Sequence, residues 1–374
     1  MMKRKYYFLI IMLLSVVYFT GTQPPEIADR IMVHAIGIDV EEEGYRVTMQ
    51  TFTPESSGSE ISIDPSQPNV SIVSDSGRTV GEAIRICFNR LGGNIFIGQN
   101  QILLFGRGVD LLQKEDLFGY FLSSSETFLN VDCAAAENTA EEILRTPITG
   151  NAITSDKYPE MIRSASDNGR CVEVSFTELL DRINSHEKTL VLPTFSLSQQ
   201  TSGNSEGGEE KSDKLEERRL KISSGAVYAD GKFRAEISAE QMGIYGMICG
   251  SGENVHAEIS GGGRKYSETY RISSRAVTAS SEGEEIVFCI SARAIPLDSQ
   301  MFEAISDRSG SETAAKREIE NKAAAFAEAM CAEFTPEIFG ADYFLMRHYP
   351  QVYRQYADDP EELYRHVRIA VEIE

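Results

Sequence analysis

The chain has 374 residues, of which 41% are hydrophobic, and its formal net charge is −21. This length and apolar content can fill roughly two or three cores of ordinary domain size, which excludes a chain that is disordered throughout. The excess of carboxylates repels phosphate groups, so the charge argues against nucleic-acid binding.

The first 22 residues are predicted to form a signal or anchor segment. Three basic residues at positions 3–5 precede an apolar run from Tyr6 to Phe19, and two prolines follow at positions 24 and 25. This is the pattern of a secretory signal, and the positive-inside rule places the rest of the chain outside the cytoplasm. The run is shorter than the ~20 residues that span a bilayer unaided. No A-x-A-like cleavage site is evident, which favours an uncleaved N-terminal helix over cleavage and release.

The remainder predicts a mixed α/β (α+β) protein of three domains, each a largely antiparallel or mixed sheet with packed helices. The clearest boundary is the polar stretch from Gln199 to Lys214, which has no large apolar residue and cannot offset its ordering entropy. The predicted limits are 1–22 for the signal or anchor segment, 23–107 for domain I, 108–198 for domain II, 199–217 for a flexible linker and 218–374 for domain III.

Domain I is predicted from apolar runs, alternation and one helix start signal. Thr79 is a candidate N-cap with Glu82 three residues later, which is the capping-box pattern, and two glycines at 92–93 end that helix. The strands are predicted at 31–39, 45–52, 70–73, 95–97 and 101–105, with a turn at 41–44 and a loop at 54–69.

Domain II is predicted from a second capping box, Thr139 with Glu142, and from helical periodicity. Its helices are predicted at 111–122, 158–164 and 175–183, a strand at 128–134 and a short extended piece at 189–193.

Domain III is predicted to be built around one long helix at 311–334. Five apolar residues recur on one face of it, namely Ile319, Ala323, Phe326, Met330 and Phe334. Ser238 with Gln241 forms a third capping box, which opens a helix at 238–247. Strands are predicted at 221–228, 232–235, 256–260, 265–277, 285–295 and 366–373.

No catalytic, cofactor-binding or metal-binding residue is predicted. The six cysteines include no C-x-x-C pair, and the five histidines include no H-E-x-x-H frame. Buried free thiols are favoured, although disulfides are permitted outside the cell. The glycine run 261–263 lacks the Lys-Ser/Thr of a P-loop, so it is interpreted as a hairpin loop.

Aromatic residues cluster near the C-terminus. They either cap the core of the last domain or form an interface, since aromatic residues favour interfaces. The cluster comprises Tyr343, Phe344, Tyr349, Tyr353 and Tyr356.

Several short phrases, in this order and spacing, resemble the C subunits of bacterial spore germinant receptors, the Ger(x)C family. The phrases are 26–30 and 35–39, 77–79 with 82–83, 98–106, 191–193, 335–340 and 347–350. The resemblance implies a non-enzymatic, extracytoplasmic subunit at the inner spore membrane, acting through protein contacts with membrane-embedded A and B subunits. The chain departs from the family pattern in two places. Thr22 stands where the lipobox cysteine is expected, so no lipid attachment is predicted. Gln99 stands where the family often has a histidine.

An alternative function is a secreted or membrane-anchored ligand-binding protein or hydrolase, with a site assembled from residues far apart in the sequence. A concave, polar-lined pocket with strongly perturbed carboxylates would favour this alternative, whereas flat domain faces would favour the receptor subunit.

Overall fold

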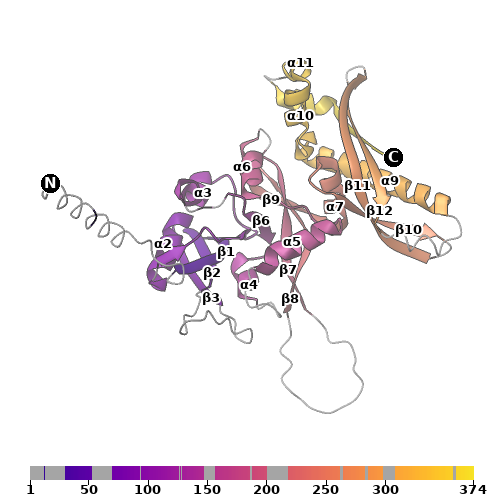
Figure 1. Cartoon of the computed structure of the whole chain (residues 1–374). Helices are drawn as coiled ribbons and strands as arrows, with labels where there is room; N and C mark the ends of the chain where they lie inside the picture. The colour runs from indigo at the N-terminus through magenta and orange to yellow at the C-terminus, as the bar shows by residue number, and fades with distance from the viewer. Residues whose placement is uncertain are drawn as a thin grey trace, which may run out of the picture.

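The computed structural model of the chain is shown in Figure 1. It describes residue 12 and residues 30–52, 70–92, 94–125, 127, 129–146, 156–185, 188–199, 218–261, 264–282, 285–297, 308–356 and 359–374. The loop at 54–69, residues 200–217 of the linker, Thr22 and all of the N-terminal segment except Met12 lie outside the described residues. Within the described part of the chain, no helix combines the length and apolarity needed to cross a bilayer.

The N-terminal part of the chain forms one large sheet with the strand order β3-β2-β1-β5-β6-β7-β8-β9, in which β4 also pairs with β1. Its centre is parallel, because β1, β5, β6 and β7 run in one direction, while both ends are antiparallel hairpins. The strands are β1 (Arg30–Glu41), β2 (Gly44–Phe52), β3 (Val70–Gly77), β4 (Asn94–Phe96), β5 (Ile102–Phe105), β6 (Asp132–Ala136), β7 (Leu190–Gln199), β8 (Arg218–Ala229) and β9 (Lys232–Ser238).

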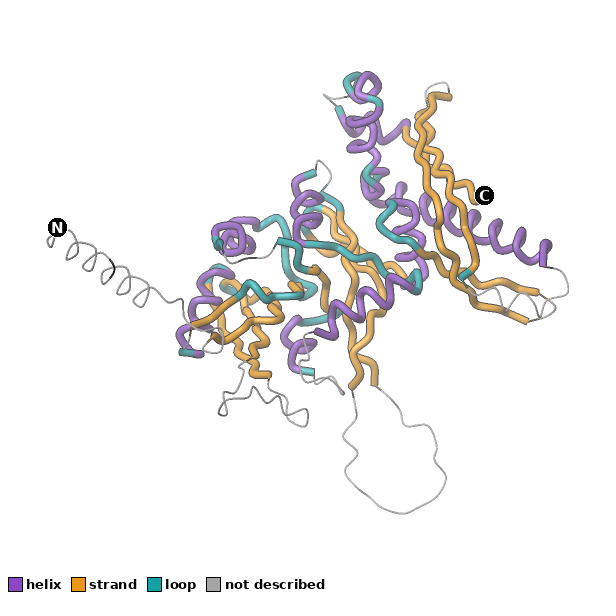
Figure 2. Tube along the Cα trace, in the orientation of Figure 1, coloured by secondary structure: helices purple, strands orange, loops and turns teal. Residues whose placement is uncertain are grey.

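The helices between Val80 and Asn184 pack on this sheet or on one another (Figure 2). Hydroxyl N-caps begin three of them, because the side chains of Thr79, Thr139 and Ser175 accept hydrogen bonds from backbone N–H groups three residues later. The helices are α2 (Val80–Leu91), α3 (Lys114–Ser123), α4 (Ala140–Arg145), α5 (Lys157–Asp167) and α6 (Phe176–Asn184).

The C-terminal part forms a second sheet in the order β10-β11-β12-β13. The long helix α9 (Arg308–Phe334) contacts β10 and β13, and the five apolar residues predicted for its inner face are all buried. The other elements are β10 (Asn254–Gly261), β11 (Arg264–Glu282), β12 (Glu285–Pro296), β13 (Val367–Ile373), the 3-10 helix η3 (Pro336–Phe339), α10 (Ala341–His348), α11 (Pro350–Tyr353) and α12 (Pro360–His366).

Helix α7 (Ala239–Cys249) joins the two sheets. Its first turn carries the predicted capping box between Ser238 and Gln241, with both hydrogen bonds present. All seven residues from Met242 to Ile248 are buried, which is the pattern of a helix enclosed on every side. The helix contacts β8 and β9 of the large sheet, β10 of the small sheet and α9. One continuous core therefore runs from Val33 in β1 to Val371 in β13.

The mixed α+β fold predicted from the sequence is confirmed, and most elements lie where they were expected. The large sheet continues across the predicted limit at 107/108, since β5 pairs with both β1 and β6. Strands β7 and β8, on either side of the predicted linker, are direct neighbours with Gln199 opposite Arg218. The three domain limits stay a prediction.

Several predicted elements differ from the structure at their ends, and three of them illustrate why. Helix α3 begins at Lys114 rather than 111 because the N–H of Leu111 donates to the Gly231 carbonyl, across to the β8–β9 turn. The strand predicted at 128–134 starts at Asp132. The extended piece predicted at 189–193 continues to Gln199 as β7, because β8 supplies a full-length partner.

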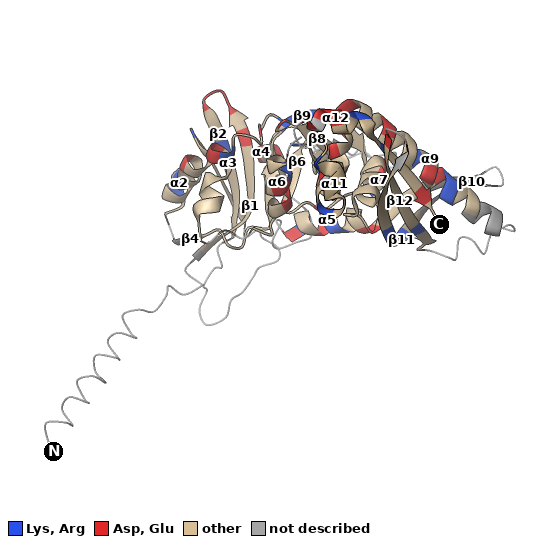
Figure 3. Cartoon of the chain, turned by 90° about the horizontal axis from the view of Figure 1, so that it is seen from above, with Lys and Arg blue, Asp and Glu red and all other residues tan. Residues whose placement is uncertain are grey.

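The aromatic cluster near the C-terminus lies mostly against a small second core. Phe344, Tyr349, Tyr353 and Tyr356 pack on the buried residues of that core, whereas Tyr343 is 58% exposed. The core-capping interpretation therefore describes four of the five aromatic residues. Acidic and basic residues occur along the helices and strands of both parts of the molecule (Figure 3).

Candidate functional site

The cysteines are unpaired thiols in the structure. Cys87, Cys133 and Cys171 are buried, and burial raises the pKa of each thiol, so all three are protonated at neutral pH. Among the described residues, no group of three or more His, Cys, Asp and Glu side chains is placed to hold a metal ion.

The described histidines are scattered over the fold. His34 is buried in β1 with Nδ1 3.8 Å from a carboxylate oxygen of Asp156, and burial lowers its pKa. His256 faces Thr269 across the β10–β11 pair, and His366 lies against the ring of Tyr356. His348 stacks on Phe344. His186 lies outside the described residues.

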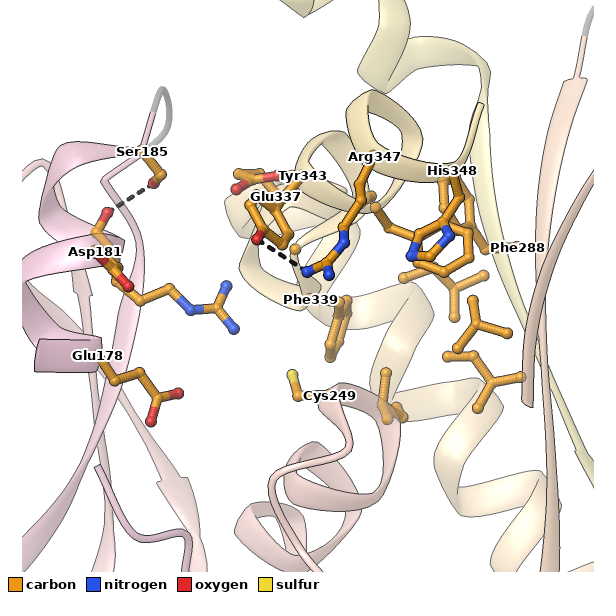
Figure 4. Close-up of a pocket in the computed structure, with 18 of the residues that line it drawn as sticks. Glu178, Asp181, Ser185, Cys249, Phe288, Glu337, Phe339, Tyr343, Arg347 and His348 are labelled. Atoms are coloured by element: carbon orange, nitrogen blue, oxygen red, sulfur yellow. Dashed lines mark hydrogen bonds between the residues drawn. The ribbon is translucent and has the colours of Figure 1, made fainter. Parts of the chain in front are cut away.

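A concave site, a cleft of about 670 Å³, lies between the two parts of the molecule. One wall is α6, and the opposite wall is η3 with α10; the C-terminal end of α7 and strands β11 to β13 complete it. Figure 4 shows Glu178, Asp181 and Ser185 on the α6 wall, facing residues of η3 and α10 across the opening. We call this site the cleft throughout.

Arg182 is the central cation of the cleft. Helix α6 is anchored by the buried residues Phe176, Leu179 and Ile183, and this fixes the wall from which Arg182 projects. Its guanidinium lies beside Gly340, where an added Cβ would be 3.5 Å from Nη1. The pKa of Arg182 is raised above its already high ordinary value, with Tyr245 as the main electrostatic cause against the effect of burial, so the guanidinium is charged at physiological pH.

Arg182 has no ion-pair partner within 4.0 Å among the described residues. A half-buried cation loses part of its hydration, and that cost is recovered only when an anion or an acceptor replaces the water. The structure therefore leaves a charged donor in the cleft without a protein acceptor for it.

Glu337 is 2% exposed and lies within the same wall as Gly340. Burial, together with the neighbouring carboxyl of Asp342, raises the pKa of Glu337 to about 10. One of its oxygens accepts a hydrogen bond from the backbone N–H of Asp342 at 3.1 Å. Glu337 is consequently protonated at neutral pH and does not neutralise Arg182.

The two other arginines of the cleft are engaged by protein groups. Arg275 donates to the carbonyl of Ile248 at the end of α7, where a cation complements the helix dipole. Arg347 Nη1 lies 3.4 Å from the hydroxyl of Tyr343, a long contact between two exposed groups that the dashed line in Figure 4 marks.

The rest of the lining is largely apolar. Helices α7 and α10, strands β11 to β13 and η3 supply apolar side chains beside the charged wall of α6. These side chains are Ile248, Val277, Phe288, Ile290, Phe339, Phe344 and Ile369. The cleft thus combines an unpaired guanidinium with an apolar surface.

The polar groups of the cleft do not form a nucleophile and base pair. Burial raises the pKa of the Cys249 thiol, which keeps it protonated and unreactive at neutral pH. The hydroxyl of Ser185 donates to the carbonyl of Arg182 at 2.6 Å, which completes the end of α6. Among the described lining residues, no nucleophile is therefore paired with a base that could activate it.

Sequence reasoning did not identify the cleft. Its residues extend from Glu178 to Ile369, and no local motif joins them. Of the residues considered individually, Cys249, Tyr343, Phe344 and His348 lie in it, and none had been predicted as a site residue. The feature that marks the site is the partly buried Arg182 on α6. No sequence pattern indicates that this arginine is buried, so the sequence offered no signal for the cleft.

One of the comparisons with known proteins, the match to a family model, agrees with the resemblance. The family model described as "Spore germination protein N-terminal domain" matches residues 23–197. None of the curated proteins matches the chain. Among solved structures, the chain is similar to one titled "Crystal Structure of the GerBC protein", with 13% sequence identity and a TM-score of 0.49 over 90% of this chain and 95% of that one.

The matched region covers β1 to β7 apart from the last residues of β7, so it includes the parallel centre of the large sheet and α6. Residues 23–197 are therefore similar to the N-terminal domain of spore germination proteins, which is the kind of protein that the Ger(x)C resemblance predicted.

Proposed function

We propose that this protein is the extracytoplasmic, non-enzymatic subunit of a spore germinant receptor complex and is needed for nutrient-triggered germination. It acts through contacts with the membrane-embedded A and B subunits. The observation that carries the proposal is the family match over residues 23–197, because that region holds the strands on which the rest of the fold is assembled.

The proposed location is the outer face of the inner spore membrane. The apolar segment before residue 22 would either anchor the chain or direct its export. Thr22 has no thiol to receive a lipid, so attachment in this chain would depend on the N-terminal helix or on the partner subunits.

The non-enzymatic role is supported by the chemistry of the cleft. A hydrolase needs a nucleophile activated by a nearby base. In the cleft, the Cys249 thiol is kept protonated by burial, and the Ser185 hydroxyl is engaged by the backbone of its own helix.

A role in protein contacts is supported by apolar side chains on α10. Tyr343 and Met346 are 58% and 48% exposed, and residues three apart in a helix share one face. Tyr and Met are enriched where proteins meet.

The test is a strain in which this gene is deleted. Its spores should lose the response to the nutrient that the receptor senses, while a trigger that bypasses nutrient receptors still germinates them. Restoring the wild-type gene should restore the response, and restoring the Tyr343→Ser/Met346→Ser double variant should restore it only in part. A matched double variant of exposed leucines remote from α10, Leu122→Ser/Leu129→Ser, should behave as wild type. Normal nutrient responses in the deletion strain, for every nutrient tested, would refute the role.

A further inference from the structure

We propose that the cleft binds a small organic carboxylate with an apolar body, its carboxylate on Arg182 and its apolar part on the hydrophobic lining. This inference goes beyond the receptor role and stands independently of it.

The first support is the unpaired charge of Arg182. It projects from a rigid helix wall beside Gly340, without a carboxylate of the described residues within 4.0 Å. In a chain with a net charge of −21, acidic partners for an arginine are abundant, so an unpaired guanidinium in a recess indicates a position kept open for an external anion.

The second support is the charge balance of the lining. Among the described lining residues, the acidic ones are Glu178, Asp181 and Glu337, set against Arg182, Arg275 and Arg347. The pKa of Glu337 is raised to about 10, so this carboxyl is neutral at pH 7. Three guanidinium groups then face two groups able to carry a negative charge, and the cleft has a positive balance in an acidic protein.

The third support is the shape and apolarity of the cleft. Its volume of about 670 Å³ lies within the ~300–1,000 Å³ range of small-molecule sites. The phenylalanines at 288, 339 and 344 come from three different elements and border the same space. They offer a surface on which the apolar part of a ligand would be removed from water.

A carboxylate fits the donors better than a phosphate does. One guanidinium presents two parallel N–H groups, which match the two oxygens of a carboxylate. A phosphate carries more charge, and the other arginines are already engaged, Arg275 by the carbonyl of Ile248 and Arg347 by Tyr343. Glu178, one helical turn before Arg182, would further oppose a doubly charged ligand.

The test uses the full chain in detergent micelles, with phenylacetate as the probe and phenylacetamide as its uncharged counterpart. Phenylacetate should bind saturably in a calorimetric or ligand-observed NMR titration. Phenylacetamide should bind at least tenfold more weakly because it lacks the charge, and acetate should bind at least tenfold more weakly because it lacks the ring.

Arg182→Gln should weaken phenylacetate binding at least tenfold, and Arg182→Lys should weaken it less because the charge remains without the two-pronged geometry. Arg317→Gln is the matched control, since Arg317 is an exposed arginine of α9 outside the cleft; its affinity should equal that of the wild type. Circular dichroism spectra of all variants check that they are folded.

Three results would overturn the proposal. The first is that phenylacetate does not bind to the wild type. The second is that phenylacetamide binds as well as phenylacetate, because the cleft would then be an apolar site without anion recognition. The third is that a folded Arg182→Gln variant keeps wild-type affinity. The amide comparison is made on the wild type and decides the question even if both Arg182 variants fail to fold.

Discussion

At the scale of single residues, Asp39 connects two parts of the large sheet that are distant in sequence. From β1 it accepts hydrogen bonds from the backbone N–H groups of Ala140 and Glu141, at 2.7 and 2.9 Å, at the start of α4. Asp39 is buried; its bond to the Ala140 N–H is buried and its bond to the Glu141 N–H is partly buried, so water replaces this acceptor poorly. The side chain therefore caps a helix about a hundred residues further along the chain.

Replacing Asp39 with Ala should lower the free energy of unfolding by about 2 kcal/mol, because two largely buried donors lose their acceptor. Urea denaturation of the wild type and the variant measures this difference. Thr139→Ala is the matched control at the same helix end, since the Thr139 side chain accepts only the more exposed Glu142 N–H. It should cost about 1 kcal/mol, and an equal or larger cost for Thr139→Ala would contradict the assignment.

The buried pair Glu337 and Asp342 predicts a pH dependence of stability. The pKa of Glu337 is raised to about 10 by burial and by Asp342, above its value in the unfolded chain. The folded state therefore holds a proton that the unfolded state releases above about pH 4.5. This contribution to stability is complete below that pH and is lost as the pH rises toward 10.

Between pH 6 and pH 9, the free energy of unfolding should fall through this one group, because over this range only the unfolded state has released the proton. The Glu337→Gln variant keeps a side chain of the same shape without the titration. The difference between variant and wild type, measured by denaturation across this range, should grow in favour of the variant. Parallel pH profiles for the two proteins would show that Glu337 is already ionised in the fold.

Sequence could predict the residue-scale features that are local. Thr79, Thr139 and Ser238 were expected as N-caps because the cap and its partner lie three residues apart, and each caps its helix. At Thr79 only half of the predicted capping box forms. The Thr79 side chain accepts from the N–H of Glu82, but the Glu82 carboxylate accepts from the N–H of Arg78 rather than from that of Thr79. Asp39 and Arg182 could not be assigned, because their roles depend on groups brought close by folding.

At the scale of elements, α7 depends on a close approach to the end of α5. A Cβ built at Gly243 would lie 1.9 Å from the carbonyl oxygen of Gly169. Gly169 itself has φ = +65°, a conformation that suits glycine. The two backbones can therefore meet only because position 243 has no side chain.

The Gly243→Ala variant should be destabilised by about 1–3 kcal/mol, because the obstructing atom belongs to the backbone and cannot rotate away. Thermal unfolding followed by circular dichroism measures the effect. Gly119→Ala is the control: Gly119 lies within α3, and nothing would contact its added Cβ within 4 Å. That substitution should be neutral or stabilising by up to about 1 kcal/mol, through higher helix propensity. Equal loss in both variants would show that the contact at Gly243 does not limit packing.

Element types were predictable where periodicity was strong, as in α9 with its buried apolar face. Element ends were not predictable where a neighbour determines them. Strand β7 extends to Gln199 only because β8 pairs along its whole length. It also carries two buried polar residues, Thr194 and Ser196, which give no sequence signal for a buried strand.

At the scale of the whole molecule, one core passes through both sheets by way of α7. The sequence supplied the mixed fold class and the order of elements. It could not show that β5 joins the two predicted domains in one sheet, because strand order is set by pairing between distant segments.

This continuous core predicts that the chain folds without its N-terminal segment. A protein lacking residues 1–22 should be soluble and should give the same circular dichroism spectrum and melting temperature as the full chain in detergent. Aggregation under conditions in which the full chain is folded would indicate that the segment packs on the body.

The most direct test of the receptor role is to isolate the protein, carrying a C-terminal tag, from detergent-solubilised membranes of native spores. We expect it in the membrane fraction with an intact N-terminus by mass spectrometry, and we expect the A and B subunits to co-purify with it. A chain trimmed near Thr22, found in the soluble fraction without the A and B subunits, would contradict its assignment as a subunit of the membrane complex.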